Sequence, residues 1–246
     1  RVHLIPIFDD NYVFVLEDSF ASEAVVVDPG ESSKVRAYLK EKGLNLKALL
    51  LTHHHNDHIG GAEELKKDFG AVVYAPLKNK VQIPFADIYV QEGDTVECGG
   101  LNFEVLAFPG HTLGHVAFYN SLRHWLFSGD VLFGLGCGRL FEGTPAQAYE
   151  SLQKLKSLPA QTLVYCAHEY TEANLQFCRM LSLNDNSPIL GGDEDLELYA
   201  NELTSKRELN LPSVPLKLFI EMKVNPFLLA KNVEQFAYLR DLRNRN

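Results

Sequence analysis

We expect an α+β fold from this sequence: an αββα sandwich of two packed sheets with helices outside, followed by a smaller helical domain. Short apolar strands alternate with helical segments over the first two thirds of the 246 residues. Near Tyr170 the composition changes, and helical periodicity replaces strand alternation. Hydrophobic residues make up 46% of the chain, which is ample for a core. We therefore divide the chain into residues 1–169 and 170–246.

The strands of the first domain are short apolar runs bounded by turn residues. Asp9-Asp10-Asn11 follows the first strand, and Asp28-Pro29-Gly30 closes the third. The predicted strands are Val2–Ile7, Val13–Leu16, Ala24–Val27, Lys47–Leu51, Val72–Tyr74, Ile88–Val90, Thr95–Cys98, Phe103–Ala107, Val116–Tyr119, Trp125–Ser128 and Thr162–Cys166.

Helices are predicted where capping residues and glycine stops bracket an apolar periodicity. Ser32 or Ser33 is the expected cap of a helix that runs to about Lys42 and ends at Gly43. The other predicted helices cover Ile59–Phe69, Thr144–Leu158, and residues 171–182, 193–209 and 232–243. Breaker clusters at 184–188 and 211–215 separate the last three.

The net charge and the spacing of the cysteines limit the binding partners and the cellular compartment that we expect. A formal net charge of −9 argues against nucleic acid and anionic membranes as partners. No apolar run approaches the roughly 20 residues of a membrane span, and no signal peptide is visible. The four widely spaced cysteines (Cys98, Cys137, Cys166 and Cys178) favour reduced, mostly buried thiols and a cytoplasmic location. One or two disulfides in a periplasmic enzyme are the alternative.

The motif H-x-H-x-D-H at residues 53–58 carries most of the chemistry. Imidazole is the commonest nitrogen ligand for zinc and similar metals, and a carboxylate completes such a site. His53 and His55 are two apart at a strand end, so their side chains point the same way and hold one ion. Asp57 and His58 fall on the following turn and serve a second ion. His54 points away and is left out; a solvated histidine-rich loop or a tag scar is the alternative reading of the motif.

Three further polar side chains follow apolar strands: His111, Asp130 and His168. Seven of the nine histidines lie in the first motif or in the stretches 108–115 and 164–170 that hold His111 and His168. Two ions about 3.5–4 Å apart need a carboxylate between them, and Asp130 is the isolated candidate. We expect two divalent ions, with zinc first and iron or manganese also fitting. The first ion takes His53, His55 and His111, the second takes Asp57, His58 and His168, and Asp130 bridges them.

Ligand side chains need partners that orient them. His115 is a candidate for this supporting role, and so is Asp28 at the end of the third strand. For Asp28 a plain turn-forming role before Pro29-Gly30 is the alternative.

These motifs resemble the metallo-β-lactamase superfamily and, more narrowly, glyoxalase II, the hydroxyacylglutathione hydrolases. The resemblance spans nearly the whole chain. It rests on the metal motifs, on Asp10-Asn11-Tyr12, on the stretches at 109–115, 128–130 and 136–144, and on His168-Glu169-Tyr170-Thr171. It implies a binuclear metal-dependent thioester hydrolase, with a catalytic domain over residues 1–169 and a substrate-binding domain over 170–246.

The implied reaction converts S-D-lactoylglutathione and related 2-hydroxyacylglutathiones to glutathione and D-lactate, as the second step of methylglyoxal detoxification. A metal-bridging hydroxide attacks the thioester, with Asp57 and Asp130 as catalytic carboxylates. The leaving thiolate has a parent thiol of pKa about 8.5, so it departs with little help from an acid. No G-x-S-x-G elbow offers serine catalysis instead. We expect a monomer.

The resemblance also implies glutathione contacts from Arg139, Phe141, Tyr170, Asn174, Arg240 and Arg243. Two departures weaken this set: Leu242 stands where some relatives have lysine, and Phe141 lacks the hydroxyl of a tyrosine. Glutathione is anionic, so an acidic protein needs a local cationic patch to bind it. A solvated helix end, where arginines suit the helix dipole, is the alternative.

Other functions on this scaffold are weighed against particular features. A lactonase or β-lactamase would lack the basic tail, and a one-iron persulfide-oxidising relative usually lacks the histidine found here at 168. A nuclease does not suit the net charge. A non-catalytic binding module would be expected to lose ligands, whereas all seven are present.

Overall fold

The computed structural model describes residues 1–18, 20–183 and 193–245. They form two compact units: Arg1–Ala107 with Leu113–Gly129, and Phe108–Thr112 with Asp130–Asn246. We describe each unit by itself. The breaker cluster predicted at 184–188 lies outside the described residues. Among the described residues, no helix is long and apolar enough to span a bilayer.

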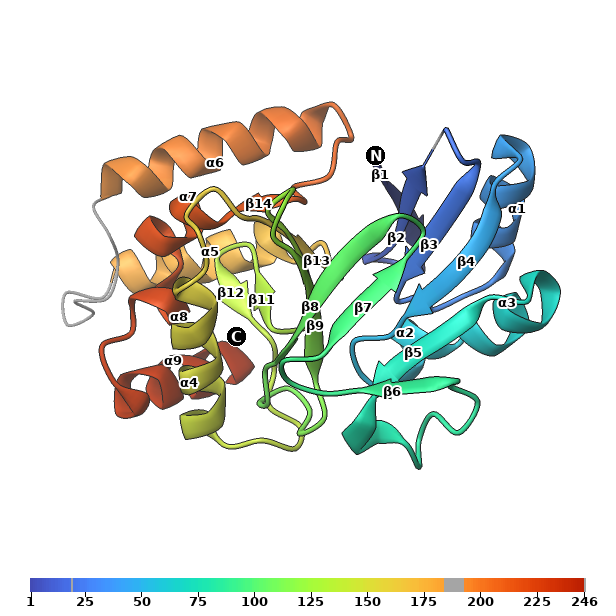
Figure 1. The fold of residues 1–246 in the computed structure, drawn as a ribbon. Helices are drawn as coiled ribbons and strands as arrows, with labels where there is room; N and C mark the ends of the chain where they lie inside the picture. Colours follow the sequence, from blue (N-terminus) through green and yellow to red (C-terminus); the bar gives the residue numbers. More distant parts are fainter. Residues whose placement is uncertain (19, 184–192, 246) are drawn as a thin grey trace. The chain divides into compact units, whose positions relative to one another are not determined.

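The first unit contains a six-stranded sheet with its strands in chain order (Figure 1). The strands are β1 (Val2–Ile7), β2 (Asn11–Asp18), β3 (Glu23–Val27), β4 (Asn45–Leu50), β5 (Val72–Pro76) and β6 (Ile88–Val90). β1 to β3 pair antiparallel, and β3 to β6 pair parallel. Because parallel neighbours end at the same edge, the residues after β3 and β4 lie side by side. The Asp28 amide accordingly donates to Leu50 O at 3.1 Å.

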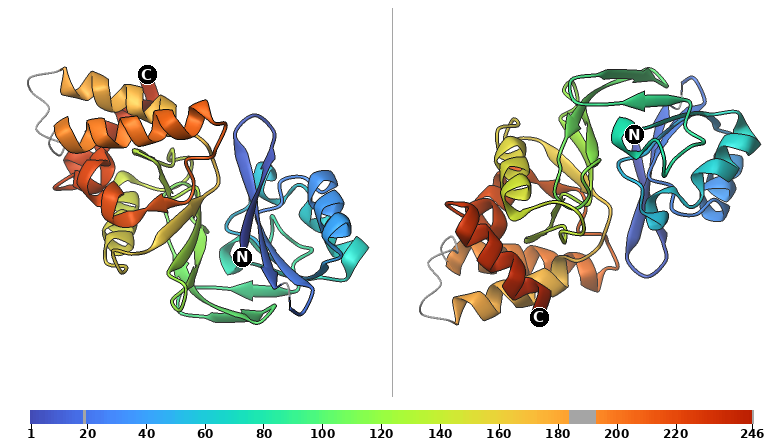
Figure 2. Two further views of the ribbon diagram at one scale, coloured as in Figure 1. Left: turned by 90° about the horizontal axis from the view of Figure 1, so that it is seen from above. Right: turned by 90° about the horizontal axis from the view of Figure 1, so that it is seen from below.

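Helices α1 (Ser33–Lys42) and α3 (Ala62–Phe69) lie on one side of this sheet (Figures 1 and 2). Val35, Leu39 and Leu65 are buried with the strand side chains in one core. Both helices end, as predicted, at glycines in the left-handed conformation.

Ser32 occupies the N-cap position of α1, as predicted, but its side chain does not cap the helix. The Ser32 hydroxyl donates instead to the Glu64 carboxylate. The carboxylate of Glu31 accepts from the amides of Ser33 at 2.9 Å and Lys34 at 3.0 Å. A charged acceptor thus satisfies the free amides at the start of the helix.

Four antiparallel strands complete the first unit: β7 (Thr95–Cys98), β8 (Leu101–Ala107), β9 (Val116–Asn120) and β10 (Trp125–Gly129). Phe14 of β2 and Phe127 of β10 are both buried, with ring centroids 5.6 Å apart. Side chains from the two sheets therefore meet in one core, which confirms the predicted packing of sheet on sheet.

The metal motif departs from the prediction in its local structure. Asp57 and His58 lie on a short helix, α2 (Asn56–Ile59), and not on a turn. The predicted helix from Ile59 also starts three residues later, because two glycines separate α2 from α3. A Cβ at Gly60 would lie 2.6 Å from Gly30 O. This close approach of backbones needs glycine and breaks the helix there.

The second unit is mainly helical, as predicted for the C-terminal part. Its helices are α4 (Pro145–Lys156), α5 (Thr171–Ser182), α6 (Asp193–Glu208), α7 (Leu218–Val224), α8 (Pro226–Leu229) and α9 (Val233–Arg245). Its strand pairs are β11 (Leu132–Phe133) with β12 (Gly136–Cys137), and β13 (Leu163–Cys166) with β14 (Leu216–Lys217). Thr144 caps α4 in a reciprocal box with Gln147. The sequence did not predict β11, β12, β14, α7 or α8.

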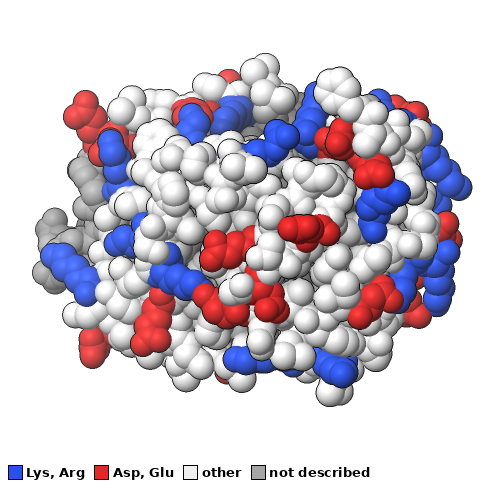
Figure 3. All heavy atoms as spheres, viewed as in Figure 1, with Lys and Arg blue, Asp and Glu red and all other residues white. Residues whose placement is uncertain are grey.

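The four cysteines are free, and Cys137, Cys166 and Cys178 are buried, as expected for reduced thiols. On the face seen in Figure 3, acidic and basic side chains are interspersed, without one large basic field.

Candidate metal centre

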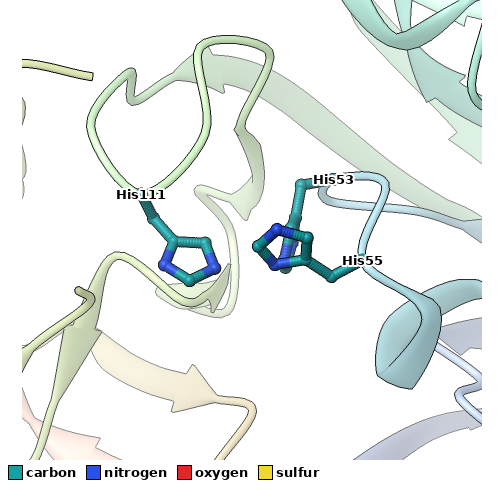
Figure 4. A group of neighbouring side chains, drawn as sticks. All are labelled: His53, His55 and His111. Atoms are coloured by element: carbon teal, nitrogen blue, oxygen red, sulfur yellow. The ribbon is translucent and has the colours of Figure 1, made fainter. Parts of the chain in front are cut away.

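The residues after β4 bring two imidazoles together. Nε2 of His53 lies 3.0 Å from Nδ1 of His55, and the ring centroids are 4.7 Å apart. Figure 4 shows both rings on the segment that follows β4. His53 is fully buried, and His55 is partly exposed. Two nitrogens held this close suit a cation that both can bind.

Asp57 and His58 form the second pair of the motif. Nε2 of His58 lies 3.5 Å from Oδ2 of Asp57, which also accepts from Nδ2 of Asn11 at 3.0 Å. On the other side of the ring, Nδ1 of His58 lies 3.0 Å from Oδ2 of Asp28. A carboxylate only accepts, so we assign the ring proton to Nδ1, which leaves the Nε2 lone pair for a metal.

Asp28 supports more than one part of the motif. Its carboxylate accepts from the Thr52 amide at 2.8 Å and from the Thr52 hydroxyl at 2.7 Å. Thr52 Oγ1 in turn lies 3.1 Å from Nδ1 of His53. Asp28 is buried and adopts φ +49°, a conformation that costs energy in a residue other than glycine. The structure confirms that Asp28 holds a histidine of the motif, and it adds Thr52, which the sequence analysis did not single out.

His54 and His115 occupy the places foreseen for them. His54 turns away to Asn79, whose Nδ2 lies 2.9 Å from Nδ1 of His54. His115 is buried and stacks on His53, with ring centroids 4.7 Å apart and planes 22° apart. Gly129, at φ +49°, makes room for this: a Cβ there would lie 2.8 Å from Nε2 of His115.

In the second unit one carboxylate faces two imidazoles. Oδ2 of Asp130 lies 3.3 Å from Nε2 of His111, and Oδ1 lies 3.4 Å from Nε2 of His168. All three side chains are buried. Nδ1 of His111 lies 2.7 Å from Arg139 O, which places its proton on that nitrogen and leaves Nε2 as an acceptor. A carboxylate with each oxygen turned to a different ring has the form of a bridging ligand.

The donor spacings test whether these side chains suit a metal. Two ligands of tetrahedral zinc, with bonds of about 2.0–2.1 Å, stand roughly 3.3 Å apart. The pairs within each unit measure 3.0 Å (His53–His55), 3.5 Å (Asp57–His58), 3.3 Å (His111–Asp130) and 3.4 Å (His168–Asp130). All seven predicted ligands belong to the groups of side chains, among the described residues, that could hold a metal ion. Figure 4 also shows His111, on the loop after β8.

Three of the six predicted substrate contacts, Arg139, Phe141 and Tyr170, lie beside predicted metal ligands. Arg139 and Phe141 are exposed, and the Phe141 ring meets the His111 ring edge-on at 5.3 Å. Tyr170 stacks on His168, with centroids 4.7 Å apart and planes 8° apart. These side chains lie beside predicted ligands, where a substrate of the metal centre would touch them.

The other three predicted contacts already have partners inside the second unit. Arg240 is buried, donates to Cys137 O at 2.7 Å and lies over the Phe227 ring. Asn174 is buried between Gly134 O, at 2.9 Å, and Nε of Arg243, at 3.1 Å. Their role toward a substrate stays a prediction.

Three guanidinium groups influence one another in this unit. Burial lowers the pKa of Arg243, and the positive charges of Arg240 and Arg139 lower it further. Among the residues that the structure describes, none of the three forms an ion pair with a carboxylate. Such a cluster attracts an anionic ligand.

Two family models match the chain: the Metallo-beta-lactamase superfamily over residues 8–168, and the Hydroxyacylglutathione hydrolase C-terminus over residues 169–246. A hydroxyacylglutathione hydrolase of Bdellovibrio bacteriovorus is 64% identical over 245 residues, covering 100% of this chain and 98% of that protein. Among solved structures, ETHE1 from Myxococcus xanthus aligns with a TM-score of 0.72 and 26% identity, over 98% of this chain and 90% of its own. TTHA1623, solved in a di-iron-bound form, aligns with a TM-score of 0.58 and 30% identity, over 68% of this chain and 91% of its own.

Proposed function

Since the chain belongs to the metallo-β-lactamase superfamily and, within it, to the hydroxyacylglutathione hydrolases, we propose that it hydrolyses S-D-lactoylglutathione and related 2-hydroxyacylglutathiones to glutathione and D-lactate. The proposal rests on one observation: the second unit contains both a carboxylate that faces two imidazoles and a cluster of arginines. Asp130 faces His111 and His168, and Arg243 stands near Arg139 and Arg240.

We propose that the chain holds two divalent ions with the seven predicted ligands. The first ion takes His53, His55 and His111, the second takes Asp57, His58 and His168, and Asp130 bridges them. Zinc suits these nitrogen and carboxylate donors, and iron or manganese fits them as well. When bound, two such ions supply Lewis acidity and lower the pKa of a water towards ~7.

The side chains of the protein have defined tasks in this scheme. Asp28 and Arg139 O hold the ring protons of His58 and His111, so that both rings present Nε2. We assign Asp57 and Asp130 as the catalytic carboxylates: they would help to hold the ions, and Asp57 or Asp130 would take the proton that water loses as its oxygen bonds to the thioester carbonyl carbon. The C–S bond then breaks, and the sulfur leaves as a thiolate that needs little protonation.

Substrate binding falls to the second unit. Glutathione carries two carboxylates, which match the charge of the arginine cluster. Tyr170 and Phe141 lie beside His168 and His111, so they would flank the thioester end of the substrate. Arg139 is the exposed member of the cluster and therefore the first contact we assign.

We further propose that the protein works as a monomer in the cytoplasm. A single chain carries every proposed ligand, so catalysis needs no second copy. The free, mostly buried thiols suit a reducing compartment. Light scattering of the purified protein checks the monomer.

One experiment tests the main proposal: metal analysis of the purified protein together with hydrolysis of S-D-lactoylglutathione, followed as loss of the thioester absorbance. We expect two ions per chain, turnover that a chelator abolishes, and recovery on adding zinc. A metal-loaded protein that turns over a lactone or a β-lactam but no glutathione thioester would overturn the substrate assignment.

A further inference from the structure

The hairpin β11–β12 links the metal site to the arginine cluster. Its two strands have only two residues each, with Leu132 opposite Cys137 and Phe133 opposite Gly136. At its open end, Asp130 lies two residues before β11 and Arg139 two residues after β12. A two-stranded hairpin is marginal on its own, and one this short needs outside support.

The support at the turn comes first from Glu221 of α7, a carboxylate with 1% exposure. Its Oε2 accepts from the Leu135 amide at 2.9 Å. Leu135 has φ +56°, a left-handed conformation that a leucine adopts only when its surroundings enforce it. Tyr199 donates to the other oxygen, Oε1, at 2.8 Å. Glu221 thus fixes the most strained residue of the turn.

Asn225 supplies the second support. Its Nδ2 donates to Phe133 O at 3.1 Å, to Gly136 O at 3.0 Å and to Glu221 at 2.9 Å. One amide group therefore reaches a carbonyl on each strand of the hairpin. Its Oδ1 accepts from the Phe227 amide at 3.1 Å and caps α8. The donor and acceptor ends of Asn225 have separate tasks.

The open end has ties of its own. The Gly138 amide donates to Val131 O at 3.2 Å, and Arg139 O lies 2.7 Å from Nδ1 of His111. Releasing the turn would pivot the strand pair about these ties, so Asp130 and Arg139, which stand beside them, would move little and the turn would move most. Gly134 O of the turn accepts from Nδ2 of Asn174, whose Oδ1 accepts from Nε of Arg243. Arg243 would therefore shift with the turn, and its spacing from Arg139 would change.

We propose that Glu221 and Asn225 are positioning residues for substrate binding: by clamping the β11–β12 turn they hold Gly134 O in place and, through Asn174, set the position of Arg243 within the arginine cluster. The inference rests on the proposed function, since it takes the glutathione part of the substrate as the ligand of that cluster. Neither residue touches the metal ligands in any contact recorded among the described residues.

Two variants test the clamp. Glu221→Gln replaces a carboxylate oxygen by an amide NH2, which cannot accept from the Leu135 amide, the Tyr199 hydroxyl or the Asn225 amide. Asn225→Asp keeps the acceptor that caps α8 but replaces the donor to the hairpin by a carboxylate oxygen that faces Phe133 O, Gly136 O and Glu221. The matched control is Tyr199→Phe, which removes the hydrogen bond to Oε1 of Glu221 and leaves the bond of Oε2 to the Leu135 amide in place.

Each protein is assayed with S-D-lactoylglutathione and with the lactoyl thioester of a short neutral thiol, which lacks the glutathione carboxylates. For both clamp variants we expect KM for the glutathione thioester to rise about tenfold or more, since the loss of one charge-assisted hydrogen bond costs roughly 10- to 100-fold in binding. The short thioester should change less than threefold in kcat/KM, and Tyr199→Phe should stay near wild type with both. An equal loss for both substrates, or no loss, overturns the proposal.

Folding and the proposed function are checked separately. If Glu221→Gln does not fold, Asn225→Asp carries the test, and Asn225→Ser, whose hydroxyl can still cap α8, should show the same selective rise in KM. If the wild-type protein itself turns over the short thioester but not the glutathione thioester, the proposed function has failed and not the clamp.

Discussion

Asp28 accepts a hydrogen bond from His58, with Oδ2 3.0 Å from Nδ1 in a fully buried pair. The same carboxylate holds the amide and the hydroxyl of Thr52. One side chain therefore fixes a histidine ring and the end of the strand that carries the other histidines. The ring keeps Nε2 directed toward Asp57, 3.5 Å away.

Asp28→Asn should weaken metal binding without unfolding the protein. Asparagine tolerates the left-handed backbone at φ +49°, but its amide must turn a donor toward Thr52 or His58. We expect a loss of about 10- to 100-fold in metal affinity, measured by competition with a chelator, and a matching loss of activity. The control is Asp68→Asn, which alters a surface pair with Arg36. Wild-type affinity in Asp28→Asn would contradict the supporting role.

Asp130→Ala should lose metal and nearly all thioesterase activity. Its two oxygens face His111 and His168, so its removal leaves both rings without their shared partner. The loss should exceed the roughly 100-fold ceiling of residues that only support a ligand. Metal content and kcat measured on the same sample check this, and a variant that keeps both would exclude the bridging role.

Arg243→Ala should raise KM for glutathione thioesters more than it lowers kcat. A charge-assisted hydrogen bond contributes about 1.5–3 kcal/mol, which corresponds to roughly 10- to 100-fold in binding. Arg245→Ala is the matched control on the same helix, because Arg245 is exposed and pairs with Asp241. Equal effects of the two substitutions would indicate that Arg243 belongs to a solvated helix end and does not bind the substrate.

High pH should destabilise the protein through buried groups. Burial raises the pKa of the Cys178 thiol and of the Tyr165 phenol to about 12 each. Both groups ionise at lower pH in the unfolded chain, near 8.5 and 10. Their contribution to stability is therefore complete below those values and is lost as pH rises through the folded pKa.

Urea unfolding between pH 8 and 11 measures this loss, and Cys178→Ala should flatten part of it. The native protein should also react slowly with thiol reagents at pH 8, since little thiolate is present. Rapid reaction of Cys178 in the folded state would show the pKa to be lower.

The sequence predicted best where local chemistry decides. Helix α5 spans Thr171–Ser182, the predicted range, and the glycine stops at 43 and 70 hold. The fold class is confirmed by the facing sheets and by both family matches. Most predicted ligands stand on the segments that follow a strand, as the sequence predicted, whereas Asp57 and His58 lie on the short helix α2.

The sequence failed where distant contacts decide. Strands of two residues such as β11 and β12 show no alternation that could be recognised, and they exist because Glu221 and Asn225 hold their turn. Asp57 and His58 fall on a helix because Gly30, Gly60 and Gly61 bring two segments of backbone together. Asp28 and Thr52 meet only after β3 and β4 pair, so no local pattern could show their hydrogen bonds.

The β11–β12 turn also imposes an order on biosynthesis. Leu135 is fixed by a residue 86 positions later, and Phe133 by one 92 positions later. At about 5–20 residues per second, a ribosome needs roughly 5–20 s to make that stretch. During this interval the nascent chain has exposed Arg139 and Asp130 without the helices that hold the hairpin. All seven proposed metal ligands, the last of them His168, are therefore synthesised before Glu221 and Asn225, which hold the hairpin.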